Sequence, residues 1–439
     1  MTSHALRTLM DTARAYAKWG KASLRARLGH SRKAAQGTKH LLLIASDFPP
    51  YVSGGIYRPL ALTRYAIQHG WRVTVLTYET RDNAFPSGTR LLESVPKEVR
   101  VLRIAQPTVV PSYNWFPKIQ GESLLQAIDL FEGAAHVLAD DPPSVVMATA
   151  PLFYSFAAGR LLSRYFGKKL VIDYRDEWTQ WPFGIFTIGR SDHVWEARCL
   201  RDADLVFFTT EAQRANQLLA FPRLDRAKCH LVPNGWEPAD FKSSTDGPEV
   251  IPPPLDSIVL THAGVFGGHI NSIGFLEALK QVLDSRPDLQ TRLTLHLVGI
   301  KDAKTLTYLS TFPHAAVIKM TDQVAKSDAA RLMKSSTGLL LIYSGSFERY
   351  IPGKLYDYLA AGLPILVFGE QGEACDIVRQ FRTGVIVPPG RPEALAAALD
   401  QLGARQPDSA RDSPGLTRWL NEHTRDNMSK RMLDFVDAL

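Results

Sequence analysis

The fold of this chain is decided by residues 41–77, which read LLLIASDFPPYVSGGIYRPLALTRYAIQHGWRVTVLT. The stretch opens on a nearly continuous apolar run, Leu41 to Ser46, followed by a turn rich in Pro and Gly. A helical pattern then extends from Arg58 to Gly70, and Val73 to Thr77 forms a second apolar run. Parallel strands buried on both faces give continuous rather than alternating apolar runs. The stretch therefore predicts a βαβ unit.

The same alternation fills the rest of the first half of the chain. Residues 39–242 are therefore expected to form one doubly wound, Rossmann-like α/β domain. Residues 243–256 are rich in Pro, Ser, Asp and Gly, which is typical of a linker. The further strands of the first domain are predicted at Val101–Ile104, Val145–Ala148, Lys169–Ile172, Leu205–Thr209 and His230–Val232.

A second set of apolar runs follows the predicted linker. Residues 257–410 are expected to form a second Rossmann-like domain, and residues 411–439 a terminal helix. A chain of 439 residues is long enough for two such domains. The predicted strands are Ile258–Thr261, Leu293–Val298, Ala316–Ile318, Gly338–Ile342, Ile365–Phe368 and Gly384–Val387.

The basic charge of the chain is concentrated at its start. Residues 1–40 hold nine Lys or Arg and a single acid, Asp11, whereas the whole chain has a net charge of +7, which leaves the remainder near −1. A nucleic-acid-binding protein is expected to carry its basic residues on the folded domain. We therefore expect no nucleic acid among the partners.

Residues 1–38 are predicted to form a basic amphipathic arm. The basic side chains fall on one face of a helix and the apolar ones mostly on the opposite face. Three interpretations are open: the helix binds an anionic membrane surface through residues 1–37, packs on its own domain, or is a targeting segment. The basic stripe favours the first of these. It consists of Arg7, Arg14, Lys18, Lys21, Arg25 and Arg32.

Cysteine usage and hydropathy indicate the compartment. Cys199, Cys229 and Cys375 lie far apart without a C-x-x-C pair, so neither a zinc site nor a disulfide framework is predicted. No stretch approaches the roughly 18 consecutive apolar residues of a membrane span. The sequence predicts a cytoplasmic protein, and the arm allows a peripheral place on the inner face of the membrane.

Two loops of the first domain hold candidate binding residues. Gly54 and Gly55 follow the first strand, where they would let the backbone approach a ligand, unless the loop is a ligand-free turn. The segment DYRDEW at residues 173–178 follows a buried strand. Its carboxylates can bind sugar hydroxyls or take a proton, its arginine can pair with phosphate, and its aromatic faces can stack on sugars. An ion pair between Arg175 and Asp176 that ties down the loop is the alternative.

Two short turns flank the start of the second domain. VPNG at residues 232–235 ends a strand just before the predicted linker and is compatible with a turn. AGVFGG at residues 263–268 follows the first strand of the second domain. Its glycines could cradle a diphosphate, although a turn without ligand is equally compatible with them.

The strongest motif is ERYIPGKLYDYLAAGLPILVF at residues 348–368. Pro352 and Gly353 open a helix whose first turn carries Lys354. A helix N-terminus together with a lysine suits a negatively charged phosphate, and Asp357, about one turn further on, could reach ribose hydroxyls. An ordinary helix with an i,i+3 pair of Lys and Asp is the alternative.

These motifs together resemble a known enzyme family. FPP at residues 48–50 with Gly54-Gly55, VPNG at residues 232–235, and above all KLYDYLAAGLPI at residues 354–365 resemble the retaining family 4 glycosyltransferases, which have the GT-B architecture. The DYRDEW segment resembles the D-x-R-D-x-W segment of relatives that build bacterial surface polysaccharides. The resemblance covers about residues 40–439.

The resemblance implies two Rossmann-like domains that face a cleft. A nucleotide-diphosphate sugar is the implied co-substrate, with no cofactor, and it would bind mostly to the second domain. A glycan or polyprenyl-linked acceptor would bind to the first domain, and the terminal helix would cross back to it. Retention is usually explained in this family by attack on the same face, while the leaving diphosphate removes the acceptor proton.

The motifs and the resemblance together predict the residues of the site. Catalytic roles are expected for Arg175, Asp176 and Lys354, and no metal is expected. Acceptor binding is expected of Tyr57, Arg58, Asp173 and Trp178. Donor binding is expected of Gly54, Gly55, Asn234, Gly235, Gly264, Phe266, Gly267, Glu348, Pro352, Gly353, Lys354, Leu355 and Asp357.

Three family features are altered in this sequence. In place of the Glu-x7-Glu pair beside the donor, it has Asp357 with Arg349 eight residues earlier, and Glu348 is the nearest substitute. The Arg and Lys that often follow the glycine loop are replaced by His269 and Asn271, and a first-domain histidine by the run ATAP at residues 148–151. These changes suggest a catalytically silent GT-B binding subunit as one alternative to a transferase. Another sugar-nucleotide enzyme on the same two-domain plan, such as an epimerase, is a second alternative.

Overall fold

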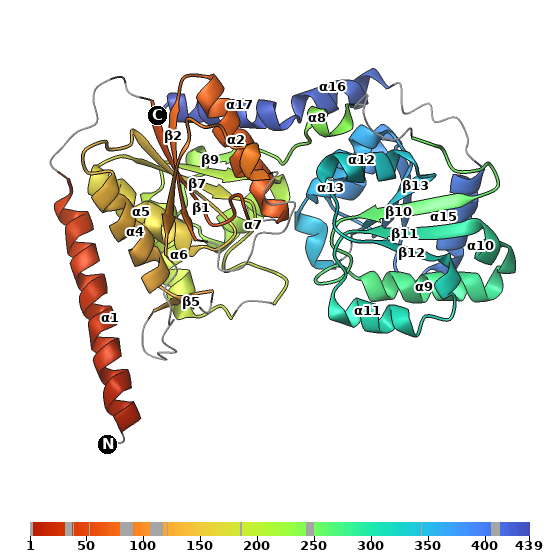
Figure 1. Cartoon of the computed structure of the whole chain (residues 1–439), viewed down its shortest axis with the longest axis horizontal. Coiled ribbons are helices and arrows are strands. Elements are labelled where there is room, and N and C mark those ends of the chain that lie inside the picture. Colours follow the sequence, from red (N-terminus) through yellow and green to blue (C-terminus); the bar gives the residue numbers. More distant parts are fainter. Residues whose placement is uncertain are drawn as a thin grey trace. The chain divides into compact units, whose positions relative to one another are not determined.

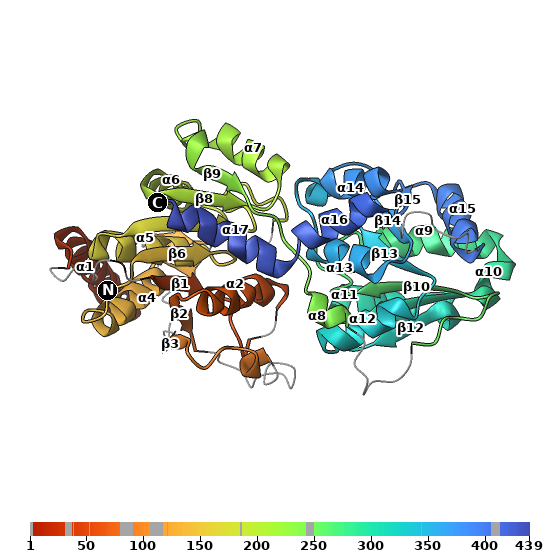
Figure 2. The same cartoon turned by 90° about the horizontal axis from the view of Figure 1, so that it is seen from above.

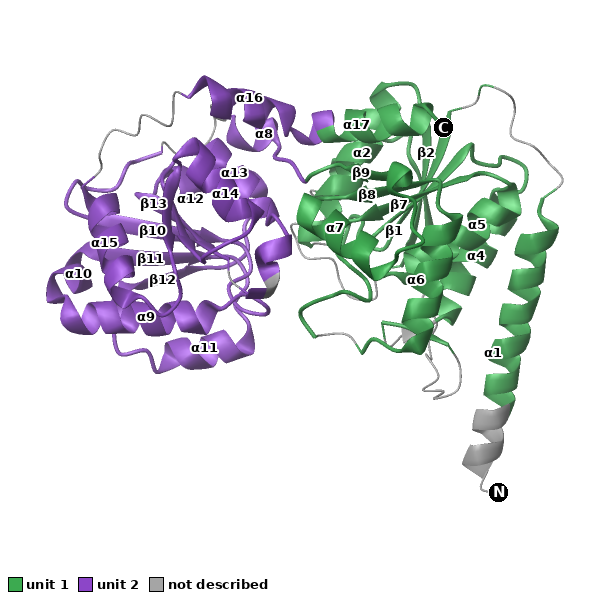
Figure 3. Cartoon of the chain, turned by 180° about the vertical axis from the view of Figure 1, so that it is seen from behind, with its two compact units in different colours: residues 1–233, 428–439 green, residues 234–427 purple. Residues whose placement is uncertain are grey.

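The computed structural model of the chain contains two compact units (Figure 3). Unit 1 consists of Met1–Pro233 and Met428–Leu439, and unit 2 consists of Asn234–Asn427. The chain therefore passes between the units twice. The structure describes residues 3–30, 37, 39–51, 53–79, 91–105, 117–120, 122–184, 187–242, 250–343, 345–404 and 413–439.

Unit 1 is built on one parallel sheet (Figure 1). Its seven strands lie in the order β3-β2-β1-β6-β7-β8-β9. The direction of growth reverses beside β1, so the loops after β1 and β6 lie at the switch point where open α/β sheets bind ligands. The strands are β1 (His40–Ala45), β2 (Arg72–Tyr78), β3 (Arg100–Ile104), β6 (Val145–Thr149), β7 (Lys169–Tyr174), β8 (Leu205–Phe208) and β9 (Cys229–Leu231).

Helices cover both faces of this sheet. On one face, α1 (Ser3–Leu28), α4 (Leu125–Val137), α5 (Tyr154–Phe166) and α6 (Arg190–Asp202) bury one apolar core with the strands. On the other face, α2 (Tyr57–Gln68) and α17 (Arg425–Asp437) contribute to a second core (Figure 2). The remaining elements are η1 (Gly54–Ile56), α7 (Glu211–Ala220), η2 (Arg226–Lys228) and a two-stranded ribbon of β4 (Lys118–Ile119) and β5 (Glu122–Ser123).

Unit 2 repeats the plan with six parallel strands in the order β12-β11-β10-β13-β14-β15. The strands are β10 (Ile258–Ala263), β11 (Leu293–Val298), β12 (Ile318–Thr321), β13 (Gly338–Ile342), β14 (Ile365–Phe368) and β15 (Gly384–Val387). The helices are α8 (Pro238–Phe241), α9 (Ser272–Ser285), α10 (Pro287–Arg292), α11 (Ala303–Ser310), α12 (Lys326–Lys334), α13 (Gly353–Ala361), α14 (Glu373–Phe381), α15 (Pro392–Gly403) and α16 (Pro414–Glu422), with η3 (Ala315–Val317) and η4 (Gly345–Arg349). The predicted architecture of two Rossmann-like α/β domains is confirmed.

The first crossing between the units lies ahead of the predicted linker. Unit 1 ends at Pro233. Residues 234–242 belong to unit 2, because α8 packs against α12 and the Lys334 ammonium donates to the Phe241 carbonyl over 2.8 Å. Residues 243–249 of the predicted linker lie outside the described residues.

The C-terminal segment forms two helices instead of the single predicted one. α16 and α17 are separated at Thr424, where the chain pairs with Trp236. The Trp236 N–H donates to the His423 carbonyl (3.1 Å), and the Arg425 N–H donates to the Trp236 carbonyl (2.9 Å). Beyond this turn, Met432 and Leu433 of α17 are buried in the core of unit 1, 1% and 4% exposed.

The arm helix α1 packs on its own unit through small residues. Ala15, Ala22 and Ala26 are buried against unit 1, because their size lets the backbone approach closely. Lys18 forms an ion pair with Asp129, and the Arg25 guanidinium lies 2.5 Å from Glu132, both acids of α4. Part of the predicted basic stripe therefore holds α1 on unit 1, as the packing interpretation expected. Arg32 lies outside the described residues.

No helix in the described part of the chain is long and apolar enough to cross a membrane.

Candidate active site

The loop after β1 in unit 1 is filled by side chains of the protein itself. The Ser53 hydroxyl accepts from the Gly55 N–H (3.0 Å) and donates to Asp47 (2.6 Å). A Cβ on Gly55 would lie 2.6 Å from the Asp47 carboxylate and 3.0 Å from the Arg175 guanidinium, which explains the glycine. Gly54 is exposed, and it has open space where a Cβ would stand.

Arg175 and Asp176 lie at the carboxyl end of β7. The Arg175 guanidinium donates to the carbonyls of Gly55 and Ala150, which follow β1 and β6. Burial lowers the pKa of Arg175, against the charges of the neighbouring carboxylates. Burial also raises the pKa of the half-buried Asp176 to about 6, although Arg175 opposes the shift. Asp176 is therefore a carboxyl that can exchange a proton close to neutral pH.

Two predicted acceptor residues, Arg58 and Asp173, form a buried ion pair. The guanidinium donates to both carboxylate oxygens, over 3.0 and 2.8 Å, and also to the carbonyls of Val232 and Pro233. The Thr149 hydroxyl donates to the same carboxylate over 2.8 Å. These bonds join α2, β6, β7 and the end of unit 1. We correct the predicted role of this pair from acceptor binding to positioning.

Trp178 is also a structural residue. Its side chain is fully buried, its indole N–H donates to Asp192 (2.8 Å), and its ring stacks on Phe153 with 5.2 Å between centroids. The indole therefore offers no face to a sugar, and the predicted stacking role is wrong. Tyr57, the fourth predicted acceptor residue, is half-buried at the first position of α2.

The buried ion pair gives a first testable prediction. Asp173→Asn should lower the free energy of unfolding by about 3 kcal/mol, because the Arg58 charge stays buried without its partner. Chemical unfolding followed by tryptophan fluorescence measures this loss. The control is Asp437→Asn, whose pair with Lys39 is about half exposed and should contribute less than about 1 kcal/mol. Equal losses in the two variants would show that the Arg58–Asp173 pair does not stabilise unit 1.

The glycine loop of unit 2 requires its glycines. Gly264 and Gly267 adopt φ values of +125° and +134°, which L side chains rarely reach. The Gly268 N–H donates to Asp302 over 2.7 Å, and a Cβ on Gly267 would collide with that carboxylate. Phe266 is fully buried in the core of unit 2, so it supports the loop from beneath instead of touching a donor through its ring.

Lys354 lies against this loop at the start of α13. A Cβ on Gly264 would stand 3.3 Å from its ammonium, which is 3.0 Å from the Nε2 atom of the buried His262. Burial and the Lys354 charge lower the pKa of His262 well below its usual range. The neutral imidazole can donate from Nδ1 to the Leu340 carbonyl (3.0 Å) and accept at Nε2 from Lys354.

The charge of Lys354 is not balanced by a carboxylate of the described residues. Asp357, one turn further along α13, pairs instead with Lys326. Burial and the Lys326 charge lower the pKa of Lys354 to about 7. No side chain caps the N-terminus of α13. A lysine and a free helix N-terminus beside a glycine loop form a local positive site for a phosphate.

The remaining predicted donor residues are distributed around this site or away from it. Glu348 is half-buried and accepts from the Gln371 amide over 2.7 Å. The side chain of Leu355 is fully buried in the core, so only its backbone can face a ligand. Pro352 and Gly353 begin α13, and Asn234 is half-buried. A Cβ on Gly235 would meet the His423 carbonyl at 2.6 Å, so this glycine serves the turn beside α17.

Sequence reasoning missed three residues that shape the lysine site. They are His262, Lys326 and Gly299, whose φ of +118° and close approach to the Gly264 carbonyl fix the two loops against each other. His262 ends an apolar run directly before the glycine loop, which is a usable signal. Lys326 begins α12 and Gly299 directly follows β11, and nothing in the local sequence pattern distinguishes them.

Two family models match the chain, one in each half. Residues 53–235 match the Glycosyl transferase 4-like domain, and residues 259–404 match Glycosyl transferases group 1. The first match covers the strands of unit 1 after β1, and the second covers all six strands of unit 2. The chain is a glycosyltransferase of the GT-B type. A comparison with curated protein sequences finds no significant match.

Solved structures share the fold at low sequence identity. Sucrose-phosphate synthase from Thermosynechococcus elongatus has a TM-score of 0.67 and 17% identity, over 91% of this chain and 98% of that chain. Anabaena HepE in complex with UDP-glucose has a TM-score of 0.64 and 15% identity, over 91% and 100%. WaaG, a glycosyltransferase involved in lipopolysaccharide biosynthesis, has a TM-score of 0.60 and 14% identity, over 90% and 99%.

Proposed function

We propose that this glycosyltransferase moves a sugar from a nucleoside-diphosphate sugar to a glycan or polyprenyl-linked acceptor, with retention at the anomeric carbon. Its place would be cell-surface polysaccharide biosynthesis, at the cytoplasmic face of the membrane. The observation that carries the proposal is Lys354, a half-buried cation beside the glycine loop without a carboxylate partner among the described residues. A diphosphate supplies the missing negative charge.

Similar proteins of known structure also support a nucleotide sugar as the substrate. Structures of Anabaena HepE that share the fold are complexes with UDP and with UDP-glucose. The DYRDEW segment and the fold shared with WaaG, a lipopolysaccharide glycosyltransferase, favour a surface-polysaccharide role. These similarities favour a nucleotide sugar over other anionic ligands for the lysine site.

The proposed mechanism assigns one task to the glycine loop and Lys354 of unit 2, and another to the residues at the carboxyl end of β7 in unit 1. Lys354 and the N-terminus of α13 stabilise the diphosphate as it departs, which is where negative charge develops in the transition state. The leaving diphosphate removes the acceptor proton on the same face of the sugar, so no side-chain base is required. Asp176 binds and orients the acceptor hydroxyl or the transferred sugar.

A donor screen tests the proposal first. The full chain is heated with UDP-, GDP-, ADP- and dTDP-sugars, and the melting temperature is recorded. One nucleotide class should stabilise the protein by about 2.7 kcal/mol at 100 times its dissociation constant. If no nucleotide sugar shifts the melting temperature at millimolar concentration, the proposed donor site is wrong.

Transfer is then measured with the donor that binds, its sugar labelled, and a lipid extract containing polyprenyl-linked glycans. The anomeric configuration of the product, determined by NMR, should match that of the donor. Isomerisation of the donor without an acceptor would identify an epimerase, and binding without any turnover would favour a silent subunit. An inverted product would refute retention while leaving the transferase class intact.

A further inference from the structure

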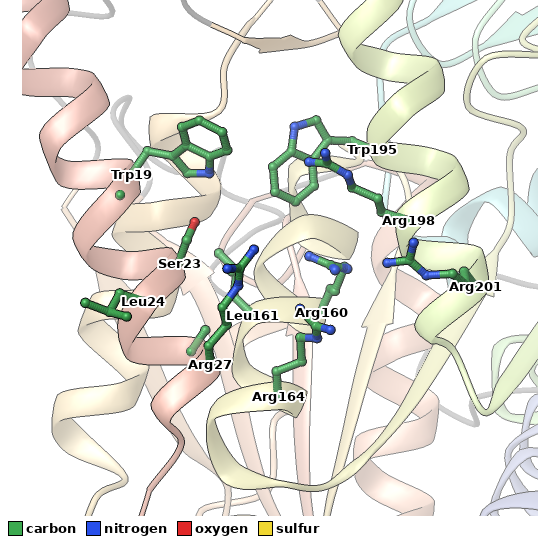
Figure 4. A pocket seen from close by; sticks show the side chains of 12 residues that line it. Trp19, Ser23, Leu24, Arg27, Arg160, Leu161, Arg164, Trp195, Arg198 and Arg201 are labelled. Atoms are coloured by element: carbon green, nitrogen blue, oxygen red, sulfur yellow. The ribbon is translucent and has the colours of Figure 1, made fainter.

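A pocket in unit 1 lies apart from the loops described above (Figure 4). It has a volume of about 700 Å³ and lies between α1, α5 and α6. Residues 19–27 of α1 form one side of it. The arginines of α5 and α6 that line it lie from the middle of each helix onward, and these helices run back from the carboxyl ends of the strands that precede them. The pocket is therefore remote from the carboxyl edge of the sheet. Its polar lining is mainly Arg27, Arg160, Arg164, Arg198 and Arg201.

The arginines of this pocket outnumber the acids that balance them. The single carboxylate of Asp202 forms ion pairs with three guanidinium groups, those of Arg160 (2.7 Å), Arg201 (2.9 Å) and Arg164 (3.4 Å). Although burial opposes it, the hydrogen bond from Arg201 and the nearby guanidinium charges lower the pKa of Asp202. Within the described ranges, neither Arg27 nor Arg198 has a carboxylate at ion-pair distance. The pocket therefore carries an excess of positive charge.

Two tryptophans lie beside the arginines of the pocket. The guanidinium groups of Arg160 and Arg198 lie 5.8 and 5.4 Å from the ring centroid of Trp195. Across the pocket, the indole N–H of Trp19 is buried without a hydrogen-bond partner in the described part of the chain. Guanidinium forks and an orphaned N–H are donors that the oxygens of a phosphate group accept well.

The outer face of α1 beside the pocket is mixed: exposed apolar side chains form a strip along it, and the exposed Arg14 and Lys21 lie on the same face. Met10, Leu24 and Leu28 are 49%, 58% and 77% exposed, and their spacing puts them with the exposed Ala17 on one face of the helix. Leu24 also lines the pocket, so the apolar strip and the arginines are adjacent. A soluble anion makes no use of such a strip, whereas a lipid offers both a phosphate and a hydrocarbon region.

We propose that the arginine pocket binds the phosphate of an anionic phospholipid headgroup, while the exposed strip of α1 rests in the interfacial region of the same bilayer. Arg27 of α1, which forms no ion pair with α4 among the described residues, holds the headgroup together with the arginines of α5 and α6. The apolar strip adds affinity that a free phosphate does not gain. The surface of unit 1 thus becomes a peripheral membrane contact independent of the donor site.

Flotation of the full chain with vesicles tests this inference. Wild type should bind vesicles of phosphatidylcholine with 30% phosphatidylglycerol, as on the order of three in ten lipids is enough for a strongly negative surface. The variant Arg27→Gln/Arg198→Gln should bind about thirtyfold more weakly, at roughly fivefold for each charge. The matched control Arg223→Gln/Arg226→Gln, which removes two exposed charges of unit 1 outside the pocket, should lose less than about threefold. Donor binding should be unchanged in both.

Three outcomes would overturn the inference. Wild type that fails to float with anionic vesicles removes the membrane contact, and equal losses in the pocket variant and its control reduce the binding to general charge. The third outcome concerns a soluble anion. Inorganic phosphate or glycerol phosphate could protect Trp19 from quenching equally in wild type and in Leu24→Ser/Leu28→Ser. If that variant also floats as well as wild type, the pocket is a soluble anion site. A change in sedimentation mass of Leu24→Ser/Leu28→Ser without lipid would instead assign the strip to a contact between two copies.

Discussion

Replacing Lys354 by methionine is expected to weaken donor binding about a hundredfold, since a charge-assisted bond to a diphosphate is worth on the order of 3 kcal/mol. Methionine keeps the apolar stem that packs beneath the glycine loop. Because the lysine is held without a carboxylate partner among the described residues, its removal should leave the melting temperature of the apo protein unchanged or raised. Titration calorimetry and thermal unfolding measure the two effects.

The lowered pKa of Lys354 adds a pH dependence with a definite sign. In the free protein the amine is charged below about pH 7 and neutral above it. An anionic donor favours the charged form, so binding above pH 7 should take up about one proton and weaken as the pH rises. Calorimetry in buffers with different ionisation enthalpies counts this proton.

Lys280→Met provides the control for both experiments, because Lys280 is an exposed residue of α9 whose one ion pair within the described residues is with Asp284, across one turn of the helix. It should keep the affinity and the proton uptake of wild type. Donor affinity within about threefold of wild type in Lys354→Met, or proton uptake that persists in this variant, would remove Lys354 from the donor site.

Asp176→Asn is expected to lower kcat at least about a hundredfold while changing the donor dissociation constant by less than about threefold. Asparagine keeps the size of the side chain but loses the negative charge with which the carboxylate binds and orients a hydroxyl group. Since the pKa of Asp176 is about 6, wild-type turnover should fall as the pH drops through 6, and the variant should lose this acid limb.

Asp434→Asn, which removes an exposed carboxylate of α17, is the matched control and should behave as wild type. Steady-state kinetics with a fixed acceptor and separate donor titrations give the two quantities. A variant that loses donor affinity and turnover to the same extent would place Asp176 at the donor instead of the acceptor.

The two-unit fold could be predicted because its signal is repeated along the chain. Apolar runs such as Leu41–Ser46 and Gly338–Ile342 are long, uninterrupted and separated by helix-length segments, so errors at single boundaries do not change the topology. Strand β12 shows the limit of this reasoning. It was expected over Ala316–Ile318, but a 3-10 turn occupies Ala315–Val317 and the strand begins at Ile318.

Side-chain direction was the part of the site that could not be predicted. Lys354 was placed correctly at a helix start because PGK defines that position locally. Arg58, Asp173 and Trp178 lie at or near the carboxyl edge of the unit 1 sheet, yet their side chains turn inward. Only the fold brings Arg58 of α2 to Asp173 of β7 across more than a hundred residues of sequence. The arm shows the same limit, since Ala15, Ala22 and Ala26 are buried against unit 1, whereas Met10, Leu24 and Leu28 are exposed.

The burial of Met432 and Leu433 of α17 in unit 1 has a consequence for biosynthesis. Residues 428–439 are translated after all of unit 2. Most of the chain has therefore left the ribosome before α17 can pack on unit 1. Until then, the apolar surface under α17 is open to chaperones or to other nascent chains. Synonymous changes that slow translation within unit 2 are therefore expected to act on the solubility of unit 1.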